Sequence, residues 1–269
     1  MEVLYGLHPV EEALRAGGRR LEYVLLSSER SAGKPKADDR TTRIVELCKL
    51  AKVPVSFDNK AQLTRIAQTD AHQGVVAAVR ERKFLAVEDL LAARGNFDHK
   101  FFLALDSVED PHNLGALLRS ADGAGVDGVL LPERRSAPIS GVVAKTSAGA
   151  SEHVPIARVT NLTRALEQLK KANVWIIGLD ERGTPDYTDF DFNADCCLVL
   201  GAEGAGLHDL VKKTCDHLLR IPMAGSVTSL NVSVAGAVVM YEALRQRTKR
   251  QAPTPVQPKP AKPRKGLGS

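Results

Sequence analysis

The sequence predicts an α/β protein with a small N-terminal unit and a larger C-terminal parallel sheet. In residues 100–247, strands written as continuous apolar runs, such as FFLAL and CCLVL, alternate with segments of helical periodicity. Such strands, each followed by a helix, are typical of a parallel sheet covered on both faces. In residues 1–80, shorter apolar strands alternate with helical patterns, which predicts a second, smaller α/β unit.

In the N-terminal unit, residues 21–26 and 74–79 are predicted strands, and a third strand starts near Pro54, which cannot continue the preceding helix. Apolar residues at helical spacing predict helices over 41–51 and 60–68. The polar stretch 31–40 predicts a mobile loop. Residues 81–99 are predicted to form a linker with a short helix near 87–93.

In the C-terminal unit, strands are expected at 101–105, 128–132, 174–179, 196–201 and 218–221. Helices are expected at 113–124, 140–148, 162–172, 207–213 and 233–247. Residues 248–269 are rich in proline and basic residues and contain no acid, so we expect a disordered tail.

The formal net charge of +5 is concentrated in the last part of the chain, because residues 245–269 contain eight Lys and Arg and no acid. This distribution is compatible with a polyanionic partner and equally with a solubilising tail.

No apolar run is long enough to cross a bilayer, and the N-terminus lacks a basic leader, so we expect a cytoplasmic protein with no membrane partner. The four cysteines have no metal-ligand spacing, so no metal site is expected, and Cys196 and Cys197 are predicted core residues.

Three segments stand where parallel sheets place ligands, at the carboxyl ends of strands. The first spans residues 106–120: Asp106 ends a strand, an acidic turn follows, and Asn113 and Arg119 lie on the next helix. Helix amides at such a start can bind an anion. A purely structural alternative is an ion pair of Arg119 with Asp106 or Asp110.

The second segment, residues 198–207, is a buried strand that enters a Gly-rich turn with one acid, Glu203. Its glycines have the spacing G-x-x-G-x-G, which differs from the dinucleotide-binding pattern G-x-G-x-x-G. Close approach of the backbone to a ligand is one interpretation of this turn, and a plain strand-to-helix turn is the other.

The third segment, residues 221–236, is a Gly/Ser loop that leads into the last helix. Ser229 and Asn231 stand just before that helix, and Ser233 is a predicted N-cap. Helix capping explains any one of these residues, but it does not explain the sequence of the whole segment 221–236.

Taken together, the three segments resemble the motifs of the SpoU (TrmH) family of RNA ribose methyltransferases in both order and spacing. The matching positions are Asp110, Pro111, Asn113, Gly115, Arg119 and Ser120, then Gly201, Glu203, Gly204 and Gly206, then residues 221–235. The resemblance covers nearly all of residues 1–247. The segment YGLHPVEEAL near the N-terminus and residues 147–160 are similar to the branch that modifies a guanosine in 23S ribosomal RNA.

The resemblance implies a fold that composition cannot show. The C-terminal domain, residues 100–247, would be a SPOUT-type parallel sheet with a deep trefoil knot, whose loops start at Gly201 and Ile221. The N-terminal α/β domain, residues 1–80, would resemble a ribosomal protein (L30e-like) and bind the RNA substrate. The family also implies a homodimer with the active site near the subunit boundary.

The implied reaction is transfer of a methyl group from S-adenosylmethionine to the ribose 2′-hydroxyl of a specific guanosine in 23S ribosomal RNA. The resemblance places the cofactor against backbone near Gly201, Gly206, Ile221, Met223 and Leu230. It implies a catalytic set that comprises Asn113, Arg119, Glu203, Ser229 and Asn231.

Within that set, Glu203 would orient the polar side chains. Because an Arg is effectively always protonated, Arg119 is expected to bind the adjacent phosphate and to stabilise the developing alkoxide rather than to act as a base.

Three other functions stay open at this stage. The enzyme could methylate another ribosomal or transfer RNA nucleotide, or the chain could be a non-catalytic RNA-binding protein on the same scaffold. The non-catalytic protein would be expected to lack Asn113, Arg119 or Glu203, and all three are present. A nucleotide-dependent oxidoreductase is disfavoured by the glycine spacing.

Overall fold

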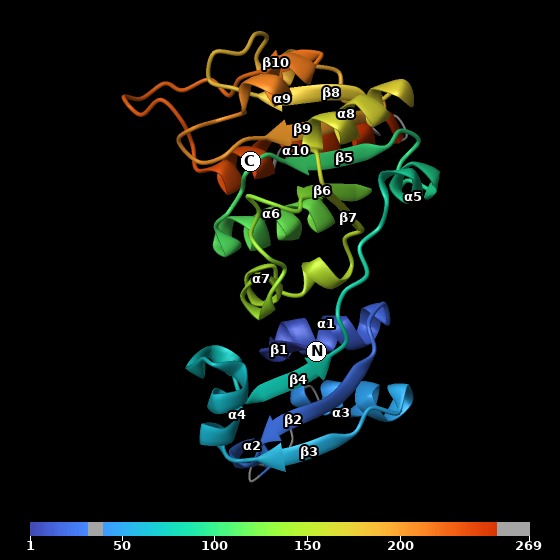
Figure 1. Cartoon of the computed structure of the whole chain (residues 1–269), viewed down its shortest axis with the longest axis vertical. Coiled ribbons are helices and arrows are strands. Elements are labelled where there is room, and N and C mark those ends of the chain that lie inside the picture. The colour runs from blue at the N-terminus through green and yellow to red at the C-terminus, as the bar shows by residue number, and fades with distance from the viewer. Residues whose placement is uncertain (32–39, 252–269) are drawn as a thin grey trace, which may run out of the picture.

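The structure is a computed structural model that describes residues 1–31 and 40–251. A four-stranded sheet in the N-terminal part and a six-stranded sheet in the C-terminal part lie toward opposite ends of the long axis (Figure 1). The predicted mobile loop at 31–40 and the predicted tail at 248–269 fall mostly on residues 32–39 and 252–269, which are outside the described residues. The last helix continues to Gln251, past the predicted boundary at 247.

The N-terminal sheet is mixed and has the strand order β1-β4-β2-β3. Strands β1 and β2 run antiparallel to β4, and β3 runs parallel to β2. Its strands are β1 (Glu2–Tyr5), β2 (Leu21–Ser27), β3 (Val55–Asp58) and β4 (Val75–Val79). The helical segments are α1 (Leu7–Ala16), α2 (Ser28–Ser31), α3 (Arg40–Ala51), α4 (Lys60–Ala67) and the 3₁₀ turn η1 (Asp70–His72).

Alternation along β4 explains why this sheet is covered on both faces. Val75 and Ala77 pack in a core cluster with residues of α1 and α3, and Val76 packs with Leu63 of α4. Successive side chains of a strand point to opposite faces, so every residue of β4 is buried although the strand is only five residues long.

The C-terminal sheet is parallel throughout and has the order β10-β8-β9-β5-β6-β7. This confirms the predicted fold class. Its strands are β5 (Phe101–Leu105), β6 (Gly128–Pro132), β7 (Ile156–Val159), β8 (Trp175–Leu179), β9 (Cys196–Leu200) and β10 (His217–Leu219). All residues of β5 and β9 are buried, as the continuous apolar runs predicted.

Helices cover both faces of this sheet. One face packs on α6 (Pro111–Gly123) and α10 (Val232–Gln251), and the other packs on α5 (Val87–Ala92), α8 (Leu162–Lys171) and α9 (Asp209–Thr214). The remaining helical segments are α7 (Gly141–Thr146) and the 3₁₀ turns η2 (Ala150–Glu152) and η3 (Tyr187–Asp189). Gly236 of α10 permits close packing, because a Cβ there would lie 2.6 Å from side-chain atoms of Leu117 and Leu200. No helix in the described ranges is long and apolar enough to span a membrane.

Cys196 and Cys197 are core residues, as predicted, and they face opposite sides of β9. Burial raises the pKa of the Cys196 thiol to about 12, and it raises that of Cys197 well above the ordinary value of 9.0. Both thiols are therefore neutral and unsuited to nucleophilic chemistry.

Several described elements were not predicted, namely β1, α1, α2, the edge strand β7 and the three 3₁₀ turns η1, η2 and η3. The predicted N-cap at Ser233 was wrong: α10 begins at Val232, and Asn231 Oδ1 accepts hydrogen bonds from the backbone N–H and hydroxyl of Ser233. The knot implied by the resemblance stays a prediction.

The two parts of the chain meet where β1 and α1 approach α7 and η2. Gly141 and Gly149 allow this approach. A Cβ on Gly141 would lie 2.7 Å from the Val3 carbonyl oxygen, and one on Gly149 would lie 2.6 Å from the Glu12 Cβ. The backbones are therefore in direct contact across the junction.

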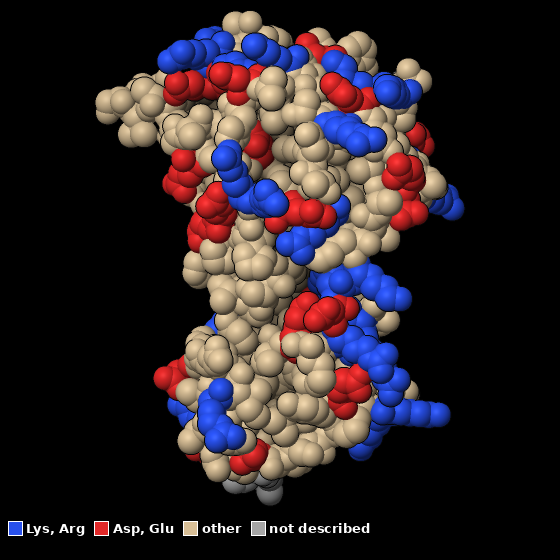
Figure 2. Space-filling model, in the orientation of Figure 1, with Lys and Arg blue, Asp and Glu red and all other residues tan. Residues whose placement is uncertain are grey.

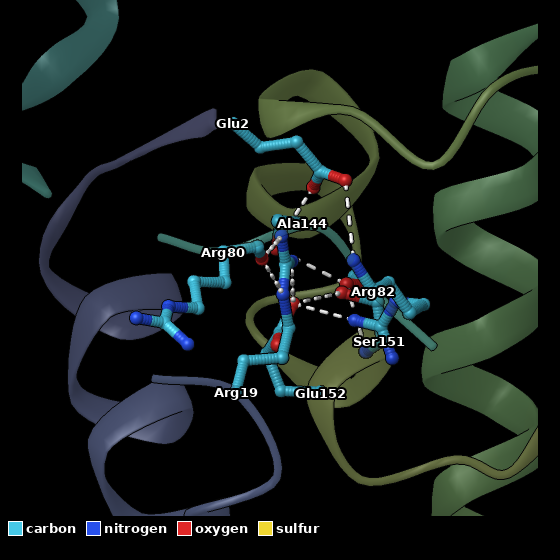
Figure 3. A network of polar contacts seen from close by, with 8 residues as sticks. Glu2, Arg19, Arg80, Arg82, Ala144, Ser151 and Glu152 are labelled. Atoms are coloured by element: carbon cyan, nitrogen blue, oxygen red, sulfur yellow. Dashed lines mark hydrogen bonds and ion pairs between the residues drawn. The ribbon is translucent and has the colours of Figure 1, made fainter. Parts of the chain in front are cut away.

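A buried charge network crosses the same junction (Figure 3). Glu152 of η2 accepts from Arg82 Nη2 at 2.7 Å and from Arg19 Nη1 at 3.4 Å, and Arg19 also pairs with Glu2. The Arg19 Nε donates to the Arg80 carbonyl at 2.9 Å. Burial lowers the pKa of Arg82, and the nearby Glu152 carboxylate opposes that effect. These ion pairs tie the N-terminal part and the linker to the C-terminal part.

Candidate active site

The candidate site lies at the carboxyl ends of β5 and β9, which are neighbours at the centre of the sheet. Leu105 pairs with Leu200, and the Asp106 N–H donates to the Leu200 carbonyl at 2.8 Å, so both strands end at the same level. From β5 the chain moves outward to β6, whereas β8 and β10 lie on the far side of β9. This change of direction is the topological switch point at which α/β sheets bind ligands.

The first motif forms the start of α6. Asp110 is the N-cap, and its carboxylate accepts from the N–H groups of His112 and Asn113 at 3.2 and 3.1 Å. Pro111 occupies the first helical turn, where a missing N–H does no harm. This rigid start leaves Asn113 buried with its amide directed toward the second motif.

Asn113, Glu203 and Asn231 form one hydrogen-bonded group from all three motifs. The Asn113 Nδ2 donates to Glu203 Oε2 at 3.1 Å, and the Asn231 Nδ2 donates to Asn113 Oδ1 at 3.0 Å. A longer contact of 3.4 Å joins Asn231 Nδ2 to Glu203 Oε1. Two amides, 90 and 28 positions away from Glu203 in the sequence, thus fix the orientation of its carboxylate.

The Gly-rich turn is a tight hairpin rather than a plain strand-to-helix turn. Ala202 and Gly206 exchange backbone hydrogen bonds of 3.0 and 2.9 Å. A Cβ on Gly201 would lie 2.1 Å from the Gly206 carbonyl carbon, so only glycine fits there. Gly204 and Gly206 have φ of 78° and 69°, a region that favours glycine.

A first cavity of about 440 Å³ opens beside this hairpin. It contains all five residues predicted to hold a cofactor, together with Ser229 and Glu203: the lining includes Gly201, Glu203, Gly206, Ile221, Met223, Ser229 and Leu230. Its volume falls in the range of small-molecule sites, and its walls combine apolar side chains with the exposed backbone of small residues.

The polar end of the first cavity carries Asp180 and Lys212, whose Oδ2 and Nζ lie 2.6 Å apart. Burial alone would raise the pKa of Asp180, but hydrogen bonds from Lys212 and from the Arg182 N–H outweigh burial and lower it. Asp180 is therefore a carboxylate at neutral pH. The lining carries four acids, Asp180, Glu181, Glu203 and Asp209, and two bases, Arg182 and Lys212, so its net negative charge suits a ligand with cationic groups.

A second cavity of about 450 Å³ lies between the ends of β5, β6 and β9. It shares Ala202, Glu203, Ala205 and Val232 with the first cavity. The remaining lining residues are Ser107, Val108, Glu109, Asp110, Asn113, Arg135 and His208. Glu203 therefore lines both cavities. Two reactants, one in each cavity, would meet beside its carboxylate.

Arg119 is separated from the other predicted catalytic residues. It is exposed on α6 and is not part of the lining of either cavity in the described chain. Burial lowers the pKa of His8 in α1, and the charges of Arg40 and Arg119 lower it further, so Arg119 lies near the N-terminal part. One described chain therefore does not bring Arg119 together with the other four residues, and the catalytic role of Arg119 stays a prediction.

The structural alternative for Arg119 is also wrong, because the two candidate acids have other partners. Asp106 is buried and accepts from the His208 N–H at 2.8 Å, with its Oδ1 3.0 Å from His208 Nδ1. Asp110 caps α6. Arg119 has no hydrogen bond or ion pair to the described residues, so its guanidinium is available to another molecule.

Sequence reasoning missed Arg135 and His208 of the second cavity. Arg135 follows β6, and the same rule that selected the ends of the other strands would have found it. His208 follows the Gly-rich motif directly, but its contact with Asp106 spans 102 positions and leaves no pattern in the sequence.

Comparison with known proteins agrees with this geometry. A profile described as "SpoU rRNA Methylase family" matches residues 100–241, and one described as "RNA 2'-O ribose methyltransferase substrate binding" matches residues 3–85. The 23S rRNA (guanosine-2'-O-)-methyltransferase RlmB of Pectobacterium atrosepticum is 41% identical over 91% of this chain and 98% of its own length. RlmB of Escherichia coli K12 is 39% identical over 92% of this chain and 99% of its own.

A solved structure has the same overall fold. The SpoU methyltransferase AviRb from Streptomyces viridochromogenes, in complex with AdoMet, has a TM-score of 0.73 and 25% identity, and the match covers 92% of this chain and 90% of that one. The matches extend over both sheets rather than one. On the sequence, the fold and the motif geometry together, the chain belongs to the SpoU rRNA methylase family.

Proposed function

We propose that this protein transfers a methyl group from S-adenosylmethionine to the ribose 2′-hydroxyl of a specific guanosine in 23S ribosomal RNA. The observation that carries the proposal is the position of Glu203. It borders both cavities and is oriented by Asn113 and Asn231. The relatives named RlmB support the choice of reaction and RNA.

The first cavity fits S-adenosylmethionine by the chemistry of its walls. When bound, the cofactor supplies a methyl group already activated by a cationic sulfur. The apolar residues Ile221 and Leu230 suit the adenine ring, and the backbone of the hairpin at Gly201 offers polar groups at close range. Asp180, Glu181 and Asp209 complement a sulfonium and an ammonium group.

The residues of this chain then have to align the 2′-hydroxyl oxygen with the methyl carbon and assist loss of the hydroxyl proton. The new O–C bond forms as the C–S bond breaks, and the hydroxyl proton passes from the oxygen to solvent water. Glu203 holds the Asn113 and Asn231 amides at the boundary between the cavities. Arg119 binds the neighbouring phosphate and stabilises negative charge on the 2′-oxygen.

Because Arg119 is remote from its own cavities, this role requires a homodimer in which the partner's Arg119 completes each site. The exposed face of α10 supports such a dimer. Val234 and Tyr241 are exposed and share one face, and the Tyr241 hydroxyl lies over Gly123 of α6. A twofold interface would give both subunits the same completed site.

The N-terminal part would bind the RNA. Figure 2 shows Lys and Arg side chains gathered along one side, from the junction over the N-terminal part. Such a basic face suits the phosphates of RNA. The buried ion pairs at the junction would hold this face at a fixed angle to the two cavities (Figure 3). The cytoplasm stays the predicted location.

Purified protein incubated with labelled S-adenosylmethionine and unmodified 23S ribosomal RNA tests the proposal directly. Digestion and mass spectrometry should identify 2′-O-methylguanosine at one position. Glu203→Gln should lower turnover by about 100-fold, because it loosens the aligned groups. Glu133→Gln, an exposed acid outside both cavities, is the matched control. A mark on another nucleotide would support the alternative methyltransferase, and RNA binding with no transfer would support the non-catalytic protein.

A mixed dimer tests the role of the partner's Arg119. One chain carries Arg119→Ala and the other carries Glu203→Gln, and two affinity tags isolate the mixed species. If sites form across the interface, one of the two sites contains both native residues and activity returns. If each chain supplies its own Arg119, both sites are damaged and the mixed dimer stays inactive.

A further inference from the structure

The second cavity has the size and the position of an acceptor site. Its volume of about 450 Å³ can hold a nucleoside, and it lies next to the first cavity with Glu203 between them. Its walls come from the loops after three neighbouring strands, β5, β6 and β9. A nucleotide turned out of an RNA loop could enter here with its ribose directed toward Glu203.

Two residues of this cavity have a backbone conformation that side chains other than glycine rarely adopt. Ser107 and Arg135 have φ of 65° and 56°, and each follows a strand. The comparable residues Lys52, Gln68 and Asn173 end helices, where the left-handed conformation is a common helix stop. Strain of this kind tends to persist where a side chain must be aimed at a ligand.

A hydrogen-bonded chain fixes the guanidinium of Arg135. The buried Asp106 carboxylate can only accept, so the His208 Nδ1, 3.0 Å away, carries the proton in this contact. The Nε2 of the neutral ring is then an acceptor, and Arg135 Nη1 donates to it at 3.2 Å. One nitrogen of the guanidinium is thereby held, and among the described residues its other N–H groups have no hydrogen-bond partner, so they can bind a ligand.

The acids of the same cavity are not equivalent. Both oxygens of Asp110 accept backbone N–H groups of α6. Glu109 lines the cavity, and its carboxylate has no hydrogen bond or ion pair with any residue that the structure describes. Glu203, the third acid of the lining, is held by Asn113 and Asn231, so the cavity presents donors on Arg135 and an uncommitted carboxylate acceptor on Glu109.

We propose that the second cavity reads the base of the target nucleotide as guanine, with Arg135 and Glu109 as the specificity-determining residues and with Asp106 and His208 positioning Arg135. Guanine presents acceptors at O6 and N7, which match an Arg fork, and donors at N1 and N2, which match a carboxylate. Adenine has a donor at position 6 and an acceptor at N1, so it would oppose both residues. This inference rests on the proposed function.

The test compares short RNAs that carry guanosine, inosine or adenosine at the target position. For each RNA, binding and kcat/KM for methyl transfer are measured with the full-length protein. Arg135→Gln should reduce the preference for guanosine over adenosine by about 5- to 150-fold, the worth of one bidentate base contact. Glu109→Gln should reduce the preference for guanosine over inosine, because inosine lacks only the amino group at position 2.

Arg134→Gln is the matched control, since Arg134 is the exposed neighbour of Arg135 and lies outside both cavity linings. Affinity for S-adenosylmethionine should be unchanged in all three variants, which shows that they fold. Equal loss on guanosine and adenosine RNAs, or an unchanged preference, would overturn the assignment. If the wild type binds the guanosine RNA preferentially but transfers no methyl group, the proposed function fails, and binding by the variants still decides the inference.

Discussion

Substitution of Glu152 by Gln tests whether the buried charges at the junction hold the two parts of the chain together. The Glu152 side chain is 2% exposed, and Arg82, 10% exposed, lies 2.7 Å from it. Arg19 keeps Glu2 and the Arg80 carbonyl in the variant, but the Arg82 guanidinium loses its carboxylate partner. Removing one member of a buried pair costs about 3–5 kcal/mol, because a buried charge is left without compensation.

The loss should appear in the docking of the N-terminal part on the C-terminal part rather than in the cofactor site. Glu152→Gln should lower the free energy of unfolding in urea by about 3–5 kcal/mol, speed proteolysis in the linker and reduce RNA methylation. Affinity for S-adenosylmethionine should be unchanged. Glu22→Gln, which breaks the exposed pair with Arg80, is the matched control and should change little. A Glu152→Gln variant as stable as the control would refute the reasoning.

Two further predictions concern the cofactor hairpin and a buried histidine. Gly201→Ala should weaken S-adenosylmethionine binding by about 5- to 150-fold in calorimetry, because overpacking against the Gly206 backbone costs about 1–3 kcal/mol. Gly225→Ala, where a Cβ meets nothing within 4 Å, should bind normally, and equal affinities would contradict the packing argument. Burial lowers the pKa of His72 below its ordinary 6.5, so its contribution to stability is present above pH 6.5 and is lost as pH falls below it. His72→Gln should flatten the acid side of the stability profile by up to about 1.4 kcal/mol per pH unit, and parallel profiles would argue against it.

The sequence predicted the strands best where both faces are buried. The runs of β5 and β9 are apolar throughout because each side chain packs on one of two helical layers. The edge strand β7 was missed because Arg158 is exposed and interrupts the apolar run. The four-residue strand β1 is too short to show a period, although it pairs along its whole length with β4.

The five residues that the family resemblance assigned to the cofactor line one cavity, in loops whose shape depends on glycine and proline at fixed spacing. Gly201 is such a position, since its neighbours leave no room for a Cβ. The position of Arg119 could also have been foreseen. It lies six positions after Asn113, and at about 100° per residue these two side chains face directions about 120° apart on the helix. A matching motif therefore did not imply a shared pocket.

Arg135 and His208 show where prediction from one sequence ends. A basic residue after an apolar run looks the same whether it is a solvated surface charge or one held by a partner far along the chain. Asp106 holds the His208 ring by a hydrogen bond, although the two residues are 102 positions apart in the sequence. Only the parallel pairing of β5 with β9 brings them together.

A crystal structure of the protein with S-adenosylhomocysteine and a short RNA that carries the target guanosine would test the shared role of the two cavities most directly. The sulfur should lie in the cavity lined by Gly201 and Leu230, and the 2′-oxygen in the cavity lined by Arg135. The two atoms should face each other beside Glu203. A ribose bound outside the second cavity, or a sulfur remote from Glu203, would contradict the assignment.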